Sequence, residues 1–160
     1  MDDSTRLRQL IDRSEIADLL VRYATAIDDR HWDLLDTVFI PDAVLDYRGA
    51  GGIAGSYPEV KQWLSEVLPM FRVTQHLVLN SDVRLDGDAA RGTTQFHNPN
   101  ELTIDGKPWI FTVGGAYHDR FVRTDAGWRI AHRVEETKWW EHPMPGLPPT
   151  PPPLAAPIDL

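Results

Sequence analysis

Cysteine is absent from this sequence of 160 residues. Its absence excludes disulfides, thiolate metal sites and catalysis by a cysteine nucleophile. The sequence also lacks an apolar run near the roughly 20 residues that a helix needs to span a bilayer. Its first residues, MDDSTRLRQLIDRSE, are too charged for a signal or transit peptide. The sequence therefore predicts no membrane segment, and we expect a cytoplasmic protein.

Positive charge is scarce. Lysine and arginine number 16 against 24 aspartates and glutamates, which gives a formal net charge of −8 and a pI near 5.1. This balance argues against nucleic acid as a partner, because phosphate binding needs a clustered basic surface. No long acidic run occurs, so the excess charge is best explained as an aid to solubility.

Helical periodicity dominates the first part of the chain. A helix is predicted from Ser14, its N-cap, to Asp29, because apolar residues recur there at helical spacing. A shorter amphipathic segment precedes it over residues 5–11. A second helix is expected over residues 32–39, ended by Pro41.

A short strand and a third helix come next. Residues 43–47 alternate as a strand does, and the glycine cluster RGAGGIAG after them is typical of a loop. Ser56 and Glu59 then form a capping box, which predicts a helix that runs to about Val67.

After Pro69 the pattern changes to that of β-strands. Four long strands are predicted over residues 72–85, 90–101, 109–123 and 128–139, joined by the turn sequences DGD, IDGK and TDAG. Helices followed by an antiparallel meander indicate an α+β fold, with the helices on one face of a curved sheet. Gly114-Gly115 predicts a bulge or bend in the third of these strands. A long sheet bent around helices would enclose a pocket.

The segment from Pro143, PMPGLPPTPPPLAAPIDL, is too rich in proline for a helix or a central strand. It should be extended, either disordered or strapped across a neighbouring surface. The predicted organisation is one domain over residues 1–142, followed by this tail over residues 143–160.

Two adjacent aspartates close the first long helix. On a helical wheel Asp29 falls on the polar face, where a solvated charge is the expected state. Asp28 falls on the small-residue shoulder of the apolar face, where an unpaired carboxylate is costly to bury. The wheel alone leaves two interpretations of Asp28 open: a solvated or capping carboxylate at a helix end, and a carboxylate with a functional role.

Four histidines lie on separate predicted strands: His76, His97, His118 and His132. A strand histidine more often packs and forms hydrogen bonds than catalyses. No H-E-x-x-H pattern occurs, so a metal is the minor alternative. The chain also has no G-x-S-x-G elbow, and its glycine cluster lacks the P-loop lysine and the Rossmann order of elements.

Three stretches together resemble a known family: EIADLLVRYATAIDDRHWDLLDTVFIPDAVLDYRG, TQHLVLNSDVRLDGDAARGTTQF and GGAYHDRFVRTDAGWRIAHR. Over roughly residues 7–140 the chain resembles the SnoaL-like branch of the NTF2-like superfamily. The resemblance implies a cone-shaped α+β barrel, in which a curved, mixed, mainly antiparallel sheet wraps around helices and a deep pocket. It is more specific for the fold than for the reaction.

Within that superfamily the chain is most similar to scytalone dehydratase, the bile-acid dehydratases and the hexachlorocyclohexane dehydrochlorinase. The resemblance implies that Asp28, late in the first long helix, and His76, early in the first long strand, are catalytic. It also implies catalytic tyrosines. Tyr23 matches the bile-acid enzymes, and Tyr47 matches the DYR strand of scytalone dehydratase.

The chain also departs from these enzymes. Asn100, with His97 close by, stands where scytalone dehydratase has its second histidine. Gly115 and Tyr117 fall near its serine and asparagine, and Tyr23 falls where the dehydrochlorinase has a lysine. These differences leave the substrate open.

The chemistry implied by this resemblance needs such residues for physical reasons. A neutral histidine can take a proton from an activated carbon, a carboxylate holds its tautomer, and a tyrosine can polarise a carbonyl or protonate a leaving group. Elimination and double-bond migration both fit, and neither a metal nor an organic cofactor is required. The candidate pocket residues beside those already named are Trp63, Phe96, Phe111 and Trp139, although such residues are more often plain core.

The leading hypothesis is therefore a cofactor-independent lyase, such as a dehydratase, that acts on a small hydrophobic cyclic, aromatic or polycyclic molecule. An isomerase or cyclase of the steroid or polyketide type would use the same base. A non-catalytic ligand-binding module and the small subunit of a ring-hydroxylating oxygenase are further alternatives, and the last would need a large partner chain. We expect a homodimer or homotrimer.

Overall fold

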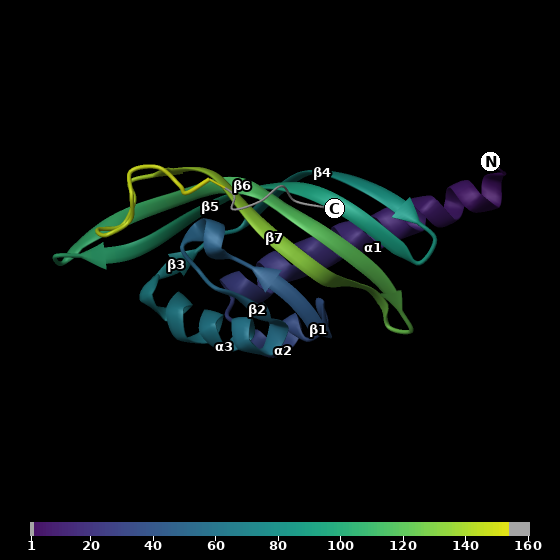
Figure 1. Cartoon of the computed structure of the whole chain (residues 1–160), viewed down its shortest axis with the longest axis horizontal. Helices are drawn as coiled ribbons and strands as arrows, with labels where there is room; N and C mark the ends of the chain where they lie inside the picture. The colour runs from purple at the N-terminus through teal and green to yellow at the C-terminus, as the bar shows by residue number, and fades with distance from the viewer. Residues whose placement is uncertain (1, 154–160) are drawn as a thin grey trace.

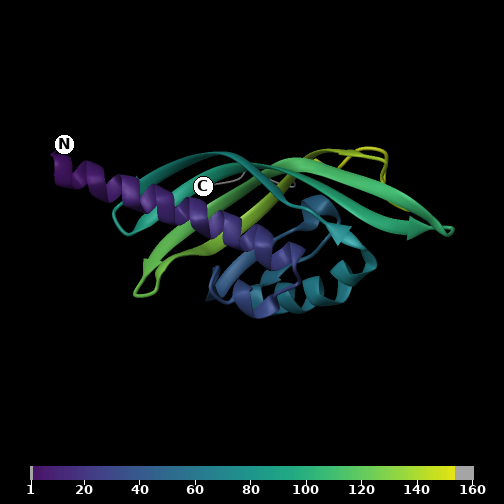
Figure 2. The ribbon, with the colours of Figure 1, turned by 180° about the vertical axis from the view of Figure 1, so that it is seen from behind.

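The computed structural model describes residues 2–153, so Met1 and residues 154–160 of the predicted tail lie outside the described residues. Within this range, a curved seven-stranded sheet arches over three α-helices (Figures 1 and 2). The helices are α1 (Asp3–Asp28), α2 (Trp32–Leu35) and α3 (Tyr57–Val67). The α+β class expected from the sequence is confirmed. No helix of the described part is long and apolar enough to cross a membrane.

The sheet is mixed, with one parallel pair among antiparallel ones. Its strands are β1 (Phe39–Asp46), β2 (Ala54–Ser56), β3 (Val73–Thr74), β4 (Leu77–Asp86), β5 (Ala89–Ile104), β6 (Lys107–Thr124) and β7 (Gly127–Glu141). Their order is β2-β1-β7-β6-β5-β3, and β4 also pairs with β5. Strand β1 runs parallel to β7, and the long strands β5, β6 and β7 pair antiparallel.

The sheet is irregular at Gly114 and Gly115, where a bulge was predicted, but the bulged strand is β7 and not β6. Gly114 pairs with Trp139 and Gly115 pairs with Thr137, so Lys138 is an extra residue on β7. A Cβ atom on Gly115 would lie 2.0 Å from the carbonyl oxygen of Glu136. Only glycine permits this close approach, and the bulge adds to the curvature of the sheet around the helices.

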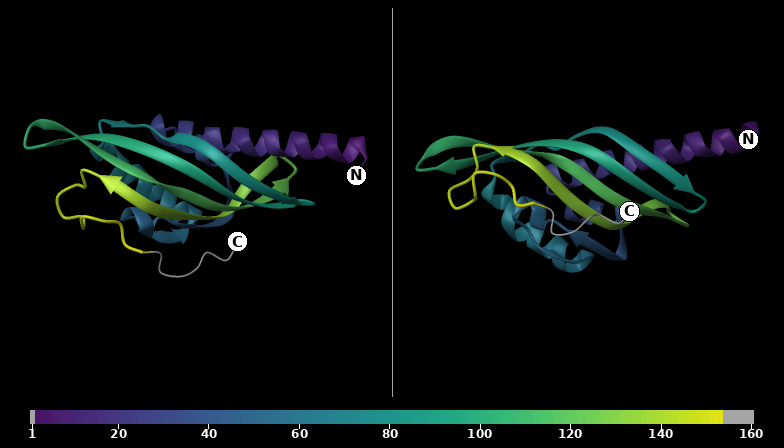
Figure 3. Two further views of the ribbon diagram at one scale, coloured as in Figure 1. Left: turned by 90° about the horizontal axis from the view of Figure 1, so that it is seen from above. Right: turned by 45° about the horizontal axis from the view of Figure 1, so that its top comes forward.

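Helix α1 is longer than the sequence predicted. It starts at Asp3 and runs through Ser14, which is exposed and caps nothing. Asp2 is the N-cap instead, since its carboxylate accepts a hydrogen bond from the backbone nitrogen of Thr5 at 2.8 Å. The shorter segment expected over residues 5–11 is the start of this same helix, and its first turns project beyond the sheet (Figure 3).

The predicted helix over residues 32–39 was too long. Helix α2 ends at Leu35 and β1 begins at Phe39. Pro41 lies inside β1 and does not end a helix. The pairing of β1 with β7 is irregular between Phe39 and Val44, so this stretch can hold a residue that has no backbone donor. The third helix agrees with its prediction, because the backbone nitrogen of Ser56 donates to the Glu59 carboxylate at 2.9 Å.

The first long strand, expected over residues 72–85, is divided. Strand β3 ends at Thr74, β4 begins at Leu77, and the register of β4 against β5 shifts between Val78 and Ser81. An extra residue at such a shift exchanges the two faces of a strand. Leu77 is therefore exposed while Val83 is buried, although simple alternation placed them on one face.

Candidate active site

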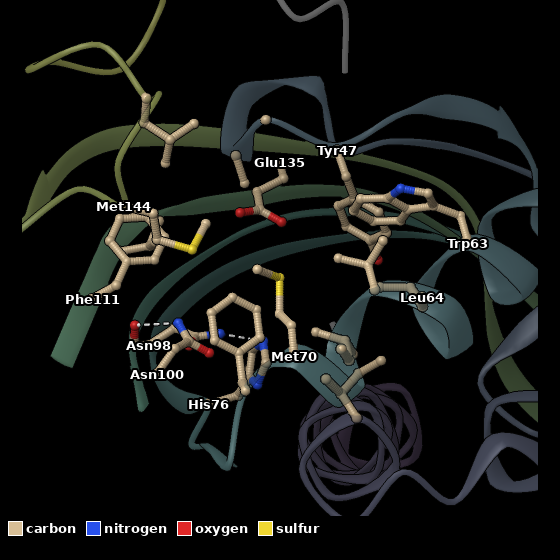
Figure 4. Close-up of a pocket in the computed structure, with 18 of the residues that line it drawn as sticks. Tyr47, Trp63, Leu64, Met70, His76, Asn98, Asn100, Phe111, Glu135 and Met144 are labelled. Carbon is tan, nitrogen blue, oxygen red and sulfur yellow. Dashed lines mark hydrogen bonds between the residues drawn. The ribbon is translucent and has the colours of Figure 1, made fainter. Parts of the chain in front are cut away.

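A cavity lies between the end of α1, α3 and the inner face of β5, β6 and β7 (Figure 4). It contains about 840 Å³ not filled by protein atoms, with open solvent at the mouth included. Most of the lining is apolar. The polar lining side chains are Tyr23, Tyr47, His76, Asn98, Asn100 and Glu135. A concave apolar space with a few converging polar groups is the usual form of a small-molecule site.

His76 and Asp28 are in direct contact. His76 lies in the break between β3 and β4, and Asp28 is the last residue of α1. The ring nitrogen Nδ1 of His76 lies 2.6 Å from Oδ1 of Asp28, and the backbone nitrogen of His76 donates to Oδ2 at 2.8 Å. Only 8% of the His76 side chain and 22% of the Asp28 side chain are exposed, so little water competes for these bonds. Asp29 is exposed, as its place on the wheel predicted.

The second ring nitrogen of His76 contacts the cavity side chain Asn98. Because the Asp28 carboxylate can only accept, the geometry assigns the hydrogen to Nδ1 and leaves a lone pair on Nε2. The amide nitrogen of Asn98 donates to Nε2. Asn100, further along β5, donates to the backbone oxygen of Asn98 at 3.1 Å. One carboxylate and one amide therefore fix the imidazole from its two sides.

Arg30 holds the segment that leads to His76. Its guanidinium donates to the backbone oxygen of Leu68 at 3.3 Å and to that of Phe71. These residues lie in and after the short 3₁₀ helix η2 (Leu68–Met70), whose side chains reach the cavity. The end of α1 is thereby joined to the loop at two points, through Arg30 and through Asp28.

Tyr23 and Tyr47 form a buried pair on the cavity wall. Their hydroxyl oxygens are 3.1 Å apart, so one donates to the other. Burial raises the pKa of both phenols well above the usual value, because the charged phenolate would lose its hydration. Both hydroxyls therefore remain protonated across the physiological range.

Arg133 lies behind the tyrosines in the core. Its guanidinium carbon is 4.1 Å from the ring centres of both Tyr23 and Tyr117, and its Nε and a terminal nitrogen each lie 2.7 Å from an oxygen of Asp119. Both members of this ion pair are fully buried. The bidentate pair and the two aromatic faces replace the water that the charges lose.

Glu135 is a cavity residue that the sequence analysis missed. It lies on β7, two residues after Arg133, and Figure 4 shows its carboxylate directed into the cavity on the side opposite His76. Burial raises its pKa to about 7, against the opposing charge of Arg133. The only sequence signal was the i, i+2 spacing that puts Glu135 on the face of Arg133.

The other predicted pocket residues divide into three groups. Trp63, Phe111 and Asn100 line the cavity, and their role in binding stays a prediction. Phe96 and Tyr117 do not line it: their rings stack at 4.4 Å in the core behind the wall. His97 and Trp139 face the outer side of the sheet, with ring centres 5.6 Å apart, because alternation along β5 turns His97 away from Asn98.

The remaining strand histidines do not form a second cluster around this site. His118, on the outer face of β6, lies 2.8 Å from the Glu136 carboxylate. His132 is partly buried, and its desolvation lowers the pKa of its imidazole. Among residues 2–153, no three histidine, aspartate or glutamate side chains gather as metal ligands would.

Comparison with known proteins gives a family for this chain. The family model described as "SnoaL-like domain" matches residues 8–134. Over 136 residues the chain is 49% identical to the uncharacterized protein Rv2910c of Mycobacterium tuberculosis, a match that covers 85% of this chain and 91% of the relative.

Solved structures share the architecture. The chain matches a candidate scytalone dehydratase of Novosphingobium aromaticivorans with a TM-score of 0.78 and 18% identity, over 92% of this chain and 96% of the other. It matches the hexachlorocyclohexane dehydrochlorinase LinA-type3 of Novosphingobium barchaimii with a TM-score of 0.74 and 20% identity, over 92% and 99%. An NTF2-like superfamily protein of Salmonella enterica has the same fold. The chain therefore belongs to the SnoaL-like domain family and has the NTF2-like fold.

Proposed function

We propose that the protein is a cofactor-independent lyase that eliminates a small group from a hydrophobic cyclic, aromatic or polycyclic substrate. The observation that carries this proposal is the Asp28–His76 contact at the edge of an apolar cavity. The family and the dehydratase and dehydrochlorinase names among its structural neighbours support the same class of chemistry.

His76 is the proposed general base. Its Nε2 takes a proton from a substrate carbon, while Asp28 keeps the ring in the required tautomer and stabilises the imidazolium that forms. The Asn98 amide donates a hydrogen bond to Nε2. Because Nε2 accepts this hydrogen bond, the amide must move aside before Nε2 can take a proton from a substrate.

Tyr23 and Tyr47 are the proposed hydrogen-bond donors. Their hydroxyl oxygens are 3.1 Å apart, and both residues line the cavity, where a substrate oxygen can accept a hydrogen bond from them. Because both phenols stay protonated, the pair can stabilise negative charge that develops on a carbonyl oxygen as the carbon loses its proton.

The rest of the lining selects for apolar molecules. Trp63 and Leu64 from α3, Met70 from η2 and Phe111 from β6 surround the polar groups. An isomerase or cyclase would share the base but return the proton to the product. Release of a leaving group into solution distinguishes the lyase from both.

The base can be tested with 5-nitrobenzisoxazole, whose elimination needs one proton removed from carbon and releases a coloured nitrophenolate. We expect His76→Ala and Asp28→Asn each to lower kcat/KM by about 10²-fold or more, the usual contribution of a positioned base. His118→Ala is the matched control, because it removes another histidine–carboxylate contact from outside the cavity. Equal rates for wild type and His76→Ala would contradict the proposal.

A further inference from the structure

Glu135 faces the proposed base across the cavity. It comes from β7, whereas His76 precedes β4, and the two polar ends point toward the same space (Figure 4). Only 9% of Glu135 is exposed. Burial and the charge of Arg133 are the influences that act on its carboxyl group, and burial is the larger. A buried carboxyl group is costly to keep charged, so the position itself favours the neutral acid.

We propose that Glu135, as a neutral carboxylic acid, is the general acid that protonates a departing hydroxyl group. This assignment rests on the proposed function and deepens it, because it names the leaving group as hydroxide and the reaction as dehydration. The substrate class is then a hydrophobic ring compound with a hydroxyl group β to a carbonyl.

The step balances without a co-reactant. His76 Nε2 takes the α-proton, the electron pair of that C–H bond forms the C=C bond, and the C–O bond breaks with its pair. The oxygen takes the proton from Glu135 and leaves as water. The products are an unsaturated carbonyl compound, an imidazolium and a carboxylate, and one proton transfer from His76 to Glu135 through solvent restores the starting state.

The charged and titratable groups around Glu135 agree with this role. They are Arg133 on the same strand, Tyr117 on β6, Tyr23 on α1 and Tyr47 after β1. The phenols stay neutral, and the charge of Arg133 is already matched by Asp119. Desolvation therefore dominates, and the pKa of about 7 makes the carboxyl a usable acid at neutral pH.

The tyrosines fit the acid role less well. Their pKa lies well above that of a free phenol, and they hydrogen bond to each other. A halide ion, in contrast, needs no proton to depart. The combination of a base on one wall and a weak acid on the other is required only for a poor leaving group such as hydroxide.

The experiment compares two leaving groups on one ring, 3-hydroxycyclohexanone and 3-acetoxycyclohexanone, which both give cyclohex-2-enone. Acetate leaves without an acid. We expect Glu135→Gln to lower kcat/KM for the hydroxy ketone by about 10²–10⁴-fold and to change that for the acetoxy ketone by less than about threefold. Retained acetate elimination also shows that the variant is folded. Glu136→Gln, which alters the neighbouring outward carboxylate, should leave both rates unchanged.

Each alternative outcome has a distinct meaning. If Glu135→Gln keeps both rates, or loses both equally, the acid assignment is overturned while the base stands. If His76→Ala keeps both rates, the proposed function fails whatever Glu135 does. If wild type releases cyclohexenone from neither ketone above the buffer rate, the assignment of a β-hydroxy carbonyl substrate is overturned, and the 5-nitrobenzisoxazole assay still reports on the base.

Discussion

Asp28 and Asp29 are neighbours in the sequence with different surroundings. The Asp28 carboxylate accepts two hydrogen bonds from His76, whereas Asp29 is exposed beyond the last turn of α1. Helical periodicity could separate the two because each residue turns the helix by a fixed angle. It could not supply the partner, since His76 lies 48 positions away and only the fold brings the two together.

The direction of the Glu135 side chain, in contrast, could not be predicted from periodicity. Its strand contains two register shifts, one opposite Gly114-Gly115 and one opposite Arg120-Phe121. Each shift exchanges the inner and outer faces, so alternation counted from Trp128 cannot decide which of two adjacent glutamates faces the cavity. The sequence therefore indicated His76, the proposed base, and missed Glu135, the proposed acid.

Burial of Glu135 should make stability depend on pH. Its pKa rises from 4.5 in the unfolded chain to about 7 in the folded one. The folded state then binds more protons between these values, so the free energy of unfolding falls as pH rises through this window, by up to about 3 kcal/mol. Glu135→Gln should remove that part of the fall. Urea denaturation at pH 5 and pH 8 measures the change in the free energy of unfolding between these two pH values. If this change is the same for Glu135→Gln as for Glu136→Gln, Glu135 does not have the raised pKa.

At the scale of elements, the best predictions came from local chemistry. The capping box at Ser56 and Glu59 starts α3 at its expected place. The turns that contain Asp and Gly join the long strands as expected. The errors came from competition between neighbouring signals. Asp2 is the N-cap of α1, so the helix begins well before Ser14, which had the same capping chemistry. The register shift in β4 has no recognisable pattern in the sequence.

The register shift between β6 and β7 at Gly114 and Gly115 provides a test of the sheet curvature. Gly115→Ala should destabilise the protein by about 1–3 kcal/mol, because the new methyl group meets the Glu136 carbonyl oxygen on the neighbouring strand. Gly114→Ala is the matched comparison. Its methyl group meets the indole of Trp139, which is 42% exposed and can swing aside. Thermal unfolding should rank Gly115→Ala as the less stable variant, and the reverse order would show that the bend tolerates a side chain.

At the scale of the whole molecule, the proline-rich tail closes one side of the cavity. Residues 143–153 form neither helix nor strand, and Met144 and Leu147 pack against the core and line the cavity. The indole nitrogen of Trp109 donates to the backbone oxygen of His142 at 2.9 Å and fixes the start of the tail.

The double substitution Met144→Ala with Leu147→Ala should weaken substrate binding more than it weakens the fold. It removes apolar surface from the mouth of the cavity, where burial contributes about 25 cal/mol per Å². We expect KM for 5-nitrobenzisoxazole to rise several-fold with kcat and the midpoint of unfolding little changed. A fall in kcat with unchanged KM would instead place the tail in the chemical step.

The fold class and the family followed from the order of elements and from the residues that carry the resemblance. The cavity wall could be predicted only in part. Phe96 and Tyr117 stack against each other in the core, and His97 turns outward, because side-chain direction depends on register that the sequence does not state.

Alternation along the hairpin of β5 and β6 has a consequence for how such a protein changes over generations. Asn98 pairs with Val113 and Asn100 with Phe111, and all four face the cavity, while the residues between them face outward. A replacement at a cavity position changes the shape and polarity of the lining and leaves the backbone pairing and the outer neighbours as they were. Single substitutions at cavity positions can therefore accumulate during evolution while the outward-facing positions of β5 and β6 keep the fold.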